Sequence, residues 1–179
     1  MATAIFFGSS TGNCEEIAKK ISSKLGKIEV FDLSGTKIEK MNDYDKIILG
    51  SSTWGDGELN DDWEDAWSDF SKLDLSNKTI ALFGLGDQES YSDEFASAMG
   101  IIYEHIKATN AKIIGFTSTE GYYHDGSKAQ IDDKFVAEFS KNTKEQIKFL
   151  RVTIDGFRDF FNPEKQKNQC LIQEAIIKS

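Results

Sequence analysis

Cysteine and histidine are scarce in this chain of 179 residues. The cysteines are Cys14 and Cys170, and the histidines are His105 and His124. Two cysteines are too few for a disulfide framework, a four-cysteine zinc site or an iron–sulfur cluster. Two histidines add too few ligands to complete such a metal site. The sequence therefore predicts no metal centre.

Long apolar runs are also missing. No stretch approaches the roughly 20 apolar residues of a membrane-spanning helix, and no basic stretch followed by an apolar segment marks a secretory signal. Hydrophobic residues make up 39% of the chain and charged residues 28%, which is typical of a globular protein. We expect a soluble monomer with a single domain over residues 1–179, in a cytoplasmic or organelle-interior setting.

Basic residues are outnumbered by acidic ones, 21 to 30, and the formal net charge is −9. Residues 47–71 contain seven Asp or Glu and no Lys or Arg, and residues 79–106 contain five acids and again no Lys or Arg. This distribution argues against nucleic acid and anionic membranes as partners, and favours partners with basic surfaces. A solvated acidic face is the alternative explanation.

Apolar stretches alternate with amphipathic ones along the chain, which predicts an α/β fold with a parallel sheet covered on both faces. The predicted strands are Thr3–Phe7, Ile28–Asp32, Lys46–Gly50, Thr79–Phe83 and Lys112–Phe116. The predicted helices are Asn13–Leu25, Asp61–Phe70 and Asp93–Lys107. The first and third of these helices have apolar residues spaced to form one buried face.

The last third of the chain is less regular. Residues 117–134 are polar and rich in turn formers, which predicts a long loop that interrupts the fifth strand. Further on, Ile147–Ile154 fits a strand, and Asn162-Pro163 begins a last helix that runs to about Lys178.

A loop rich in glycine and hydroxyl groups follows the first predicted strand. It reads Gly8-Ser9-Ser10-Thr11-Gly12-Asn13-Cys14 and leads into a helix, so its N–H and O–H groups form a cup for a phosphate. The loop has no Lys or Arg, unlike a P-loop that binds a transferable nucleotide phosphate. A phosphate monoester that belongs to a cofactor suits it better. Helix capping by Ser10 or Thr11 is the simpler alternative.

Two more loops end predicted strands and each carries an aromatic residue. Trp54 lies in the loop 51–59 and Tyr91 in the loop 84–91. In a doubly wound sheet, ligands bind at the carboxyl ends of the strands. Two rings beside a phosphate cup suit a flat, phosphorylated heteroaromatic ligand. Taken singly, each ring is also compatible with core packing or a surface anchor.

Four motifs occur together over residues 2–136. They are Gly8-Ser9-Ser10-Thr11-Gly12-Asn13; Thr53-Trp54-Gly55-x-Gly57-Glu58-Leu59 with Asp62-Trp63-Glu64; Gly86-Asp87-Gln88 with Tyr91; and Ser118-Thr119-x-Gly121-Tyr122 with Ser127-Lys128-Ala129. In combination they resemble the flavodoxins, specifically the long-chain group. The resemblance implies a flavodoxin-like doubly wound sheet of five parallel strands in the order 2-1-3-4-5, with a long loop splitting strand 5. It also implies a low-potential one-electron carrier that binds FMN.

The resemblance assigns roles to fourteen residues. Ser9, Ser10, Thr11, Gly12, Asn13 and Cys14 would hold the phosphate; Trp54 and Tyr91 would flank the isoalloxazine; Ser52, Thr53, Gly55, Leu85, Gly86 and Asp87 would line it. Cys14 stands where the family usually has Thr, so we expect weaker phosphate binding. Residues 137–179 depart from the family pattern and form an atypical C-terminal segment.

Acidic side chains near the ring-binding loops, such as Asp56 and Glu58, are expected to disfavour an anionic reduced flavin and so lower its potential. The same acids would attract basic redox proteins, a flavodoxin reductase type of donor and reductase acceptors. Gly55 lacks a side chain, so the Gly55-Asp56 peptide can rotate and place its carbonyl near a protonated flavin N5.

Three alternatives differ in function. An FMN-dependent NAD(P)H:quinone oxidoreductase would share the fold, but no nicotinamide site is identifiable. A response-regulator receiver needs clustered acids after the first strand, where this chain has Gly8-Ser9-Ser10. A cofactor-free interaction domain is the third alternative, which the altered C-terminal segment suggests.

Overall fold

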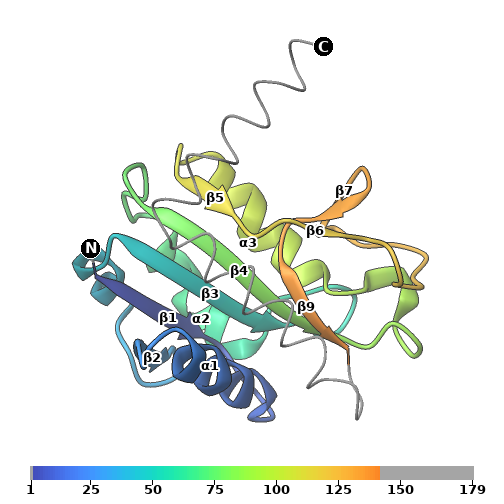
Figure 1. Ribbon diagram of the computed structural model, residues 1–179, viewed down its shortest axis with the longest axis horizontal. Coiled ribbons are helices and arrows are strands. Elements are labelled where there is room, and N and C mark those ends of the chain that lie inside the picture. Colours follow the sequence, from blue (N-terminus) through green and yellow to red (C-terminus); the bar gives the residue numbers. More distant parts are fainter. Residues whose placement is uncertain (1, 142–179) are drawn as a thin grey trace.

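The computed structural model describes residues 2–141 and contains a parallel sheet with helices on both faces (Figure 1). Its strands are β1 (Thr3–Phe7), β2 (Glu29–Asp32), β3 (Lys46–Ser52), β4 (Thr79–Gly86) and β5 (Lys112–Ile114). They lie side by side in the order β2-β1-β3-β4-β5, and every neighbouring pair is parallel. The expected strand order 2-1-3-4-5 is confirmed.

The fifth strand is divided, as expected. β5 pairs with the first half of β4 over Thr79–Ala81, and β9 (Glu138–Lys141) pairs with the second half over Phe83–Gly86. Both halves run parallel to β4, which they flank on the same side. The sequence analysis did not assign the second half to residues 138–141.

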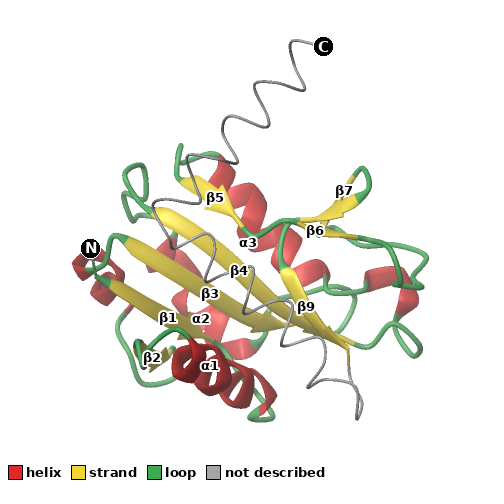
Figure 2. Cartoon of the chain, viewed as in Figure 1, coloured by secondary structure: helices red, strands yellow, loops and turns green. Residues whose placement is uncertain are grey.

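Alternate side chains of the central strands point to opposite faces, and both faces are buried. Phe6 and Leu49 belong to one apolar cluster, with α2 (Asp61–Phe70) and α3 (Ser97–Lys107). Ile5 and Ile48 belong to the other, under α1 (Asn13–Lys24). Figure 2 shows α1 on the near face and α2 and α3 behind the sheet. Burial on both faces explains why these strands read as continuous apolar runs.

The prediction for the third helix was wrong at its start. It placed the first turn at Asp93, whereas Ser92–Glu94 form a short 3-10 helix, η2, and α3 begins at Ser97. Between them Ala96 has a φ of 55°, in the left-handed region. This backbone reversal separates the two elements, and periodicity alone did not reveal it. A second 3-10 helix, η1 (Ile38–Asp43), was also not predicted.

The long loop contains regular structure of its own. β6 (Thr117–Ser118), β7 (Gln130–Ile131) and β8 (Lys134–Phe135) form a small antiparallel sheet in the order β6-β8-β7. Tyr122 packs edge-to-face on Phe135, and both side chains are buried. The expected loop is thus an appended subdomain beside α3 (Figure 1).

Two predictions fall outside the described residues, namely the strand Ile147–Ile154 and the helix from Asn162-Pro163 to Lys178. Within residues 2–141 no helix has the length and apolar character needed to cross a bilayer.

Candidate functional site

A cavity of about 410 Å³ opens where β1, β3 and β4 end. Ten of the fourteen predicted site residues line it: Thr11, Asn13, Ser52, Thr53, Trp54, Gly55, Leu85, Gly86, Asp87 and Tyr91. Ser9, Ser10, Gly12 and Cys14 are not part of the lining and lie in the adjoining loop before and within the first turn of α1. The structure therefore brings the three predicted loops to one place.

The loop before α1 exposes backbone donors. Ser10, Thr11, Gly12 and Asn13 are exposed, and their N–H groups donate no hydrogen bond to the part of the chain that the structure describes. Gly12 is the N-cap residue, with φ of 82° and no side-chain cap. The alternative in which Ser10 or Thr11 caps this helix is therefore not what the structure shows. Free N–H groups at a helix N-terminus suit an anion.

Ser9 holds this loop in place through two hydrogen bonds. Its Oγ accepts a hydrogen bond from the Cys14 N–H at 3.2 Å, and its own N–H donates to Asp62 Oδ2 of α2 at 2.8 Å. Asp62 in this way occupies one donor that an anion would otherwise use. The donors that remain are those of residues 10–13.

The Cys14 side chain is fully buried beneath the loop. Burial raises the pKa of its thiol to about 12, opposed in part by hydrogen bonds with Ser52 and Ser9. The thiol is therefore neutral at physiological pH and is not part of the cavity lining. Cys14 was predicted to contact the phosphate. In this structure its backbone N–H donates a hydrogen bond to Ser9 Oγ.

The loop that carries Trp54 is a tight hairpin. Trp54 and Glu58 exchange backbone hydrogen bonds of 3.1 and 2.7 Å, and Gly55 and Gly57 between them both have positive φ. The indole is 43% exposed, and its Nε1 donates to Ser52 Oγ at 2.9 Å. Two glycines allow the sharp reversal that presents the ring at the cavity wall.

The loop that carries Tyr91 is shaped by Asp87. Its carboxylate accepts the N–H groups of Glu89 at 3.0 Å and Ser90 at 3.2 Å, and its carbonyl accepts the Tyr91 N–H at 3.1 Å. Hydrogen bonds from Ser90, and then from the Glu89 N–H, lower the pKa of Asp87. Tyr91 is 65% exposed beyond this turn. Asp87 therefore lines the cavity and also holds the turn that leads to Tyr91.

The cavity is also lined by three residues that were not predicted from the sequence, Glu94, Phe95 and Ala96. Their apolar and acidic spacing fits a helix, so they were assigned to the start of the third helix. No signal in the sequence marked the left-handed Ala96 that turns them toward the cavity.

Neither histidine lines the cavity. His105 packs against Trp67 and Phe70, and burial lowers its pKa. His124 packs against the rings of Phe95 and Phe135, with Nε2 2.6 Å from Gln130 Oε1. Among residues 2–141, no three His, Cys, Asp or Glu side chains are grouped to hold a metal ion.

The doubly wound sheet, with a glycine- and hydroxyl-rich helix start and two exposed rings at its carboxyl edge, defines the class of flavodoxin-like α/β proteins. The flavodoxin family profile matches residues 5–144. The chain is 45% identical over 135 residues to a flavodoxin of Picosynechococcus sp., covering 74% of this chain and 79% of the relative. It is 46% identical over 132 residues to a flavodoxin of Helicobacter pylori, covering 74% and 79%.

A solved structure of Fusobacterium nucleatum flavodoxin bound to flavin mononucleotide has the same fold, with a TM-score of 0.82 at 22% identity, covering 90% of this chain and 99% of that one. The chain belongs to the flavodoxin family. The expected family, fold and electron-transfer class are confirmed. The relatives are named as flavodoxins, so the quinone oxidoreductase alternative finds no support among them.

Proposed function

We propose that this chain binds FMN in the cavity and transfers single electrons between redox proteins. The observation that carries the proposal is the continuity of the site. One cavity joins Thr11 and Asn13, at the start of α1, to the exposed rings of Trp54 and Tyr91. FMN has a phosphate at one end, a flat ring at the other and a polyol chain between them. The cavity offers backbone donors at one end and aromatic rings at the other, which suits this order of groups.

The phosphate end would be held by neutral donors. The N–H groups of residues 10–13 lie at the start of α1, where the helix dipole favours a negative charge. The hydroxyls of Ser10 and Thr11 lie in the same exposed loop. Because the loop 8–14 contains no Lys or Arg, recognition would depend on the geometry of these donors.

The ring end would be held by stacking. Bound FMN supplies the redox chemistry, and the chain supplies orientation and electrostatics. Trp54 and Tyr91 offer aromatic faces on two loops, while Leu85 and Phe95 add apolar lining to the same cavity. Part of the site stays open to solvent, which suits electron transfer at a flavin edge.

Acidic groups would set both the potential and the partners. Glu94 lines the cavity, and Asp56, Glu58 and Glu89 lie on the two ring-side loops. Their charge disfavours an anionic reduced ring and attracts basic surfaces. The proposed partners are a reductase donor and reductase acceptors with basic docking surfaces, met by a single-domain, monomeric, cytoplasmic carrier.

The direct test is a titration of the flavin-free protein with FMN, followed by the quenching of flavin fluorescence. One FMN per chain is expected to bind, and Thr11→Val with Ser10→Ala should weaken binding. A steady-state assay with NADPH and a quinone should show no turnover by the loaded protein alone. Absence of FMN binding, or rapid turnover, would contradict the proposal.

A further inference from the structure

We propose that residues 123–128 of the long loop are a brace that positions both ring-side loops, and that Gly126 is its pivotal residue. The inference rests on the proposed function, because it concerns how the chain prepares the ring end of the FMN site. It assigns to the long loop a role in ligand affinity.

The brace holds the Tyr91 loop through main-chain hydrogen bonds. The Ser92 carbonyl accepts the N–H groups of Asp125 and Gly126, each at 3.0 Å, and the Gly126 carbonyl accepts the Phe95 N–H at 3.1 Å. The Ser92 hydroxyl adds a bond to Asp125 Oδ2 at 2.7 Å. These contacts begin one residue after Tyr91.

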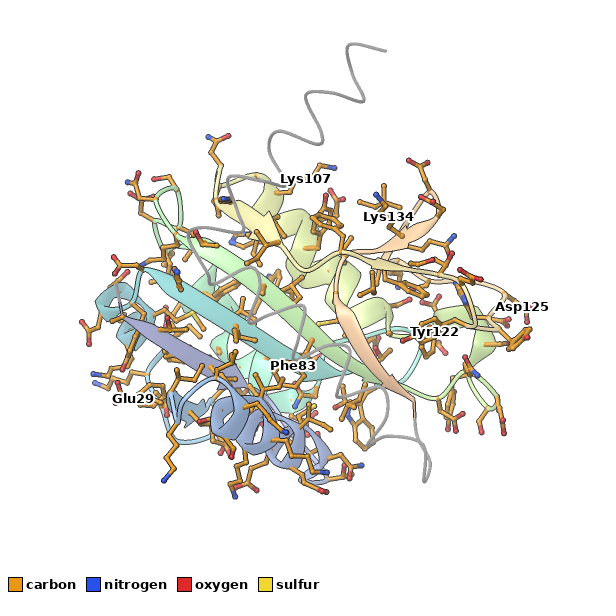
Figure 3. The ribbon with its side chains drawn as sticks, in the orientation of Figure 1. Glu29, Phe83, Lys107, Tyr122, Asp125 and Lys134 are labelled. Atoms are coloured by element: carbon orange, nitrogen blue, oxygen red, sulfur yellow. The ribbon has the colours of Figure 1, made fainter. Side chains whose placement is uncertain are left out.

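A further bond reaches the turn before Tyr91. The N–H of Tyr123 donates to Gln88 Oε1 at 3.2 Å. The loop that carries Tyr91 is therefore held on both sides by the same short segment. Figure 3 places Asp125 and Tyr122 at the end of the molecule where the long loop lies.

Gly126 fits because it has no side chain. A Cβ at this position would lie 2.5 Å from the Asp93 carbonyl oxygen and 3.3 Å from its carbonyl carbon. Both atoms belong to the backbone, so neither yields without moving the chain. Gly126 has no positive φ, and its requirement for glycine therefore comes from this close approach alone.

The same segment reaches the Trp54 hairpin through Lys128. Its Nζ lies 3.5 Å from the Asp56 carbonyl oxygen and 3.5 Å from Glu94 Oε2. Its backbone N–H donates to the buried Ser97 Oγ of α3 at 3.0 Å. Lys128 thus links the Trp54 hairpin to an anchored part of the long loop.

A pre-organised pair of loops loses less conformational freedom when a ligand binds. Loosening the brace should therefore weaken the ring contacts and leave the phosphate contacts unchanged. Riboflavin has the ring without the phosphate, so it separates the two ends. Brace variants should lose affinity for riboflavin and FMN by the same factor.

The experiment compares Gly126→Ala with Gly35→Ala, since a Cβ at Gly35 meets no atom within 4 Å. We expect Gly126→Ala to weaken FMN and riboflavin binding equally, by about tenfold, which corresponds to the loss of one or two hydrogen bonds. Gly35→Ala should bind both as the wild type does. Ser92→Ala removes one hydroxyl and should cause a smaller, equally parallel loss.

Amide hydrogen exchange of the flavin-free protein provides a readout that needs no flavin. The amides of Tyr91 and Phe95 should exchange faster in Gly126→Ala than in the wild type. Unchanged exchange would overturn the brace, as would unchanged affinities or a loss confined to FMN. Failure of the wild type to bind FMN would instead overturn the proposed function.

Discussion

The hydroxyl oxygen of Thr53 accepts a hydrogen bond from the backbone N–H of Ala98 at 3.1 Å. Ala98 is the second residue of α3 and is fully buried, and the left-handed Ala96 before this helix provides no side-chain cap. Thr53 therefore caps α3 from the loop that carries Trp54. A residue predicted to line the ligand also joins the ligand site to the core.

Replacing Thr53 by Val should lower the free energy of unfolding by about 1–3 kcal/mol, because the buried Ala98 N–H loses its acceptor while the side-chain volume is kept. FMN binding should weaken as well. Thr53→Ser retains the hydroxyl and is the matched control. Chemical denaturation measures the change, and equal stability of the Val and Ser variants would contradict this role.

The negative charge of the Asp62 carboxylate should weaken FMN binding. Asp62→Asn keeps an oxygen that can accept the Ser9 N–H but removes a negative charge beside the phosphate loop. FMN should then bind about fivefold more tightly at low salt, and the gain should shrink as salt screens the charge. Asp62→Ala should instead destabilise the chain by about 1 kcal/mol. Titrations at two salt concentrations test the prediction, which fails if the gain is independent of salt.

Cys14 should be chemically inert in the folded protein. Burial raises its thiol pKa to about 12, so almost no thiolate is present at pH 8. In a Cys170→Ser variant, a maleimide or iodoacetamide should label Cys14 only after unfolding. Rapid labelling of the native protein at pH 8 would show that the thiol is accessible and ionised.

The turn held by Asp87 should weaken in acid. Hydrogen bonds from Ser90 and Glu89 lower its pKa below the ordinary 3.8, because they stabilise the charged form. This stability is present above pH 3.8 and is lost as pH falls through the lowered folded pKa. The stability difference between the wild type and Asp87→Asn should therefore narrow below pH 3.8. A difference that stays constant in acid would contradict the assignment.

The sheet could be predicted because its strands are buried on both faces. β1 and α2 occur at the predicted bounds, and the ends of β3 and β4 extend two and three residues beyond the predictions Lys46–Gly50 and Thr79–Phe83. Apart from Leu85, those extra residues are serines and glycines, which carry no strand pattern. Pairing with neighbouring strands continues them.

The parts that escaped prediction depend on contacts between distant residues. The two-residue strands of the long loop are too short to have a period, and they form where Tyr122 and Phe135 pack together. The left-handed conformation of Ala96 occurs at a residue without turn propensity. Glu94 and Phe95 reach the cavity only because of that reversal.

One-electron transfer by this chain is tested most directly by stepwise anaerobic reduction of the FMN-loaded protein, followed by visible absorbance and potentiometry. We expect one bound flavin per chain that is reduced in two separate one-electron steps, the second at low potential. A single two-electron step, or a purified protein that takes up no FMN, would contradict it.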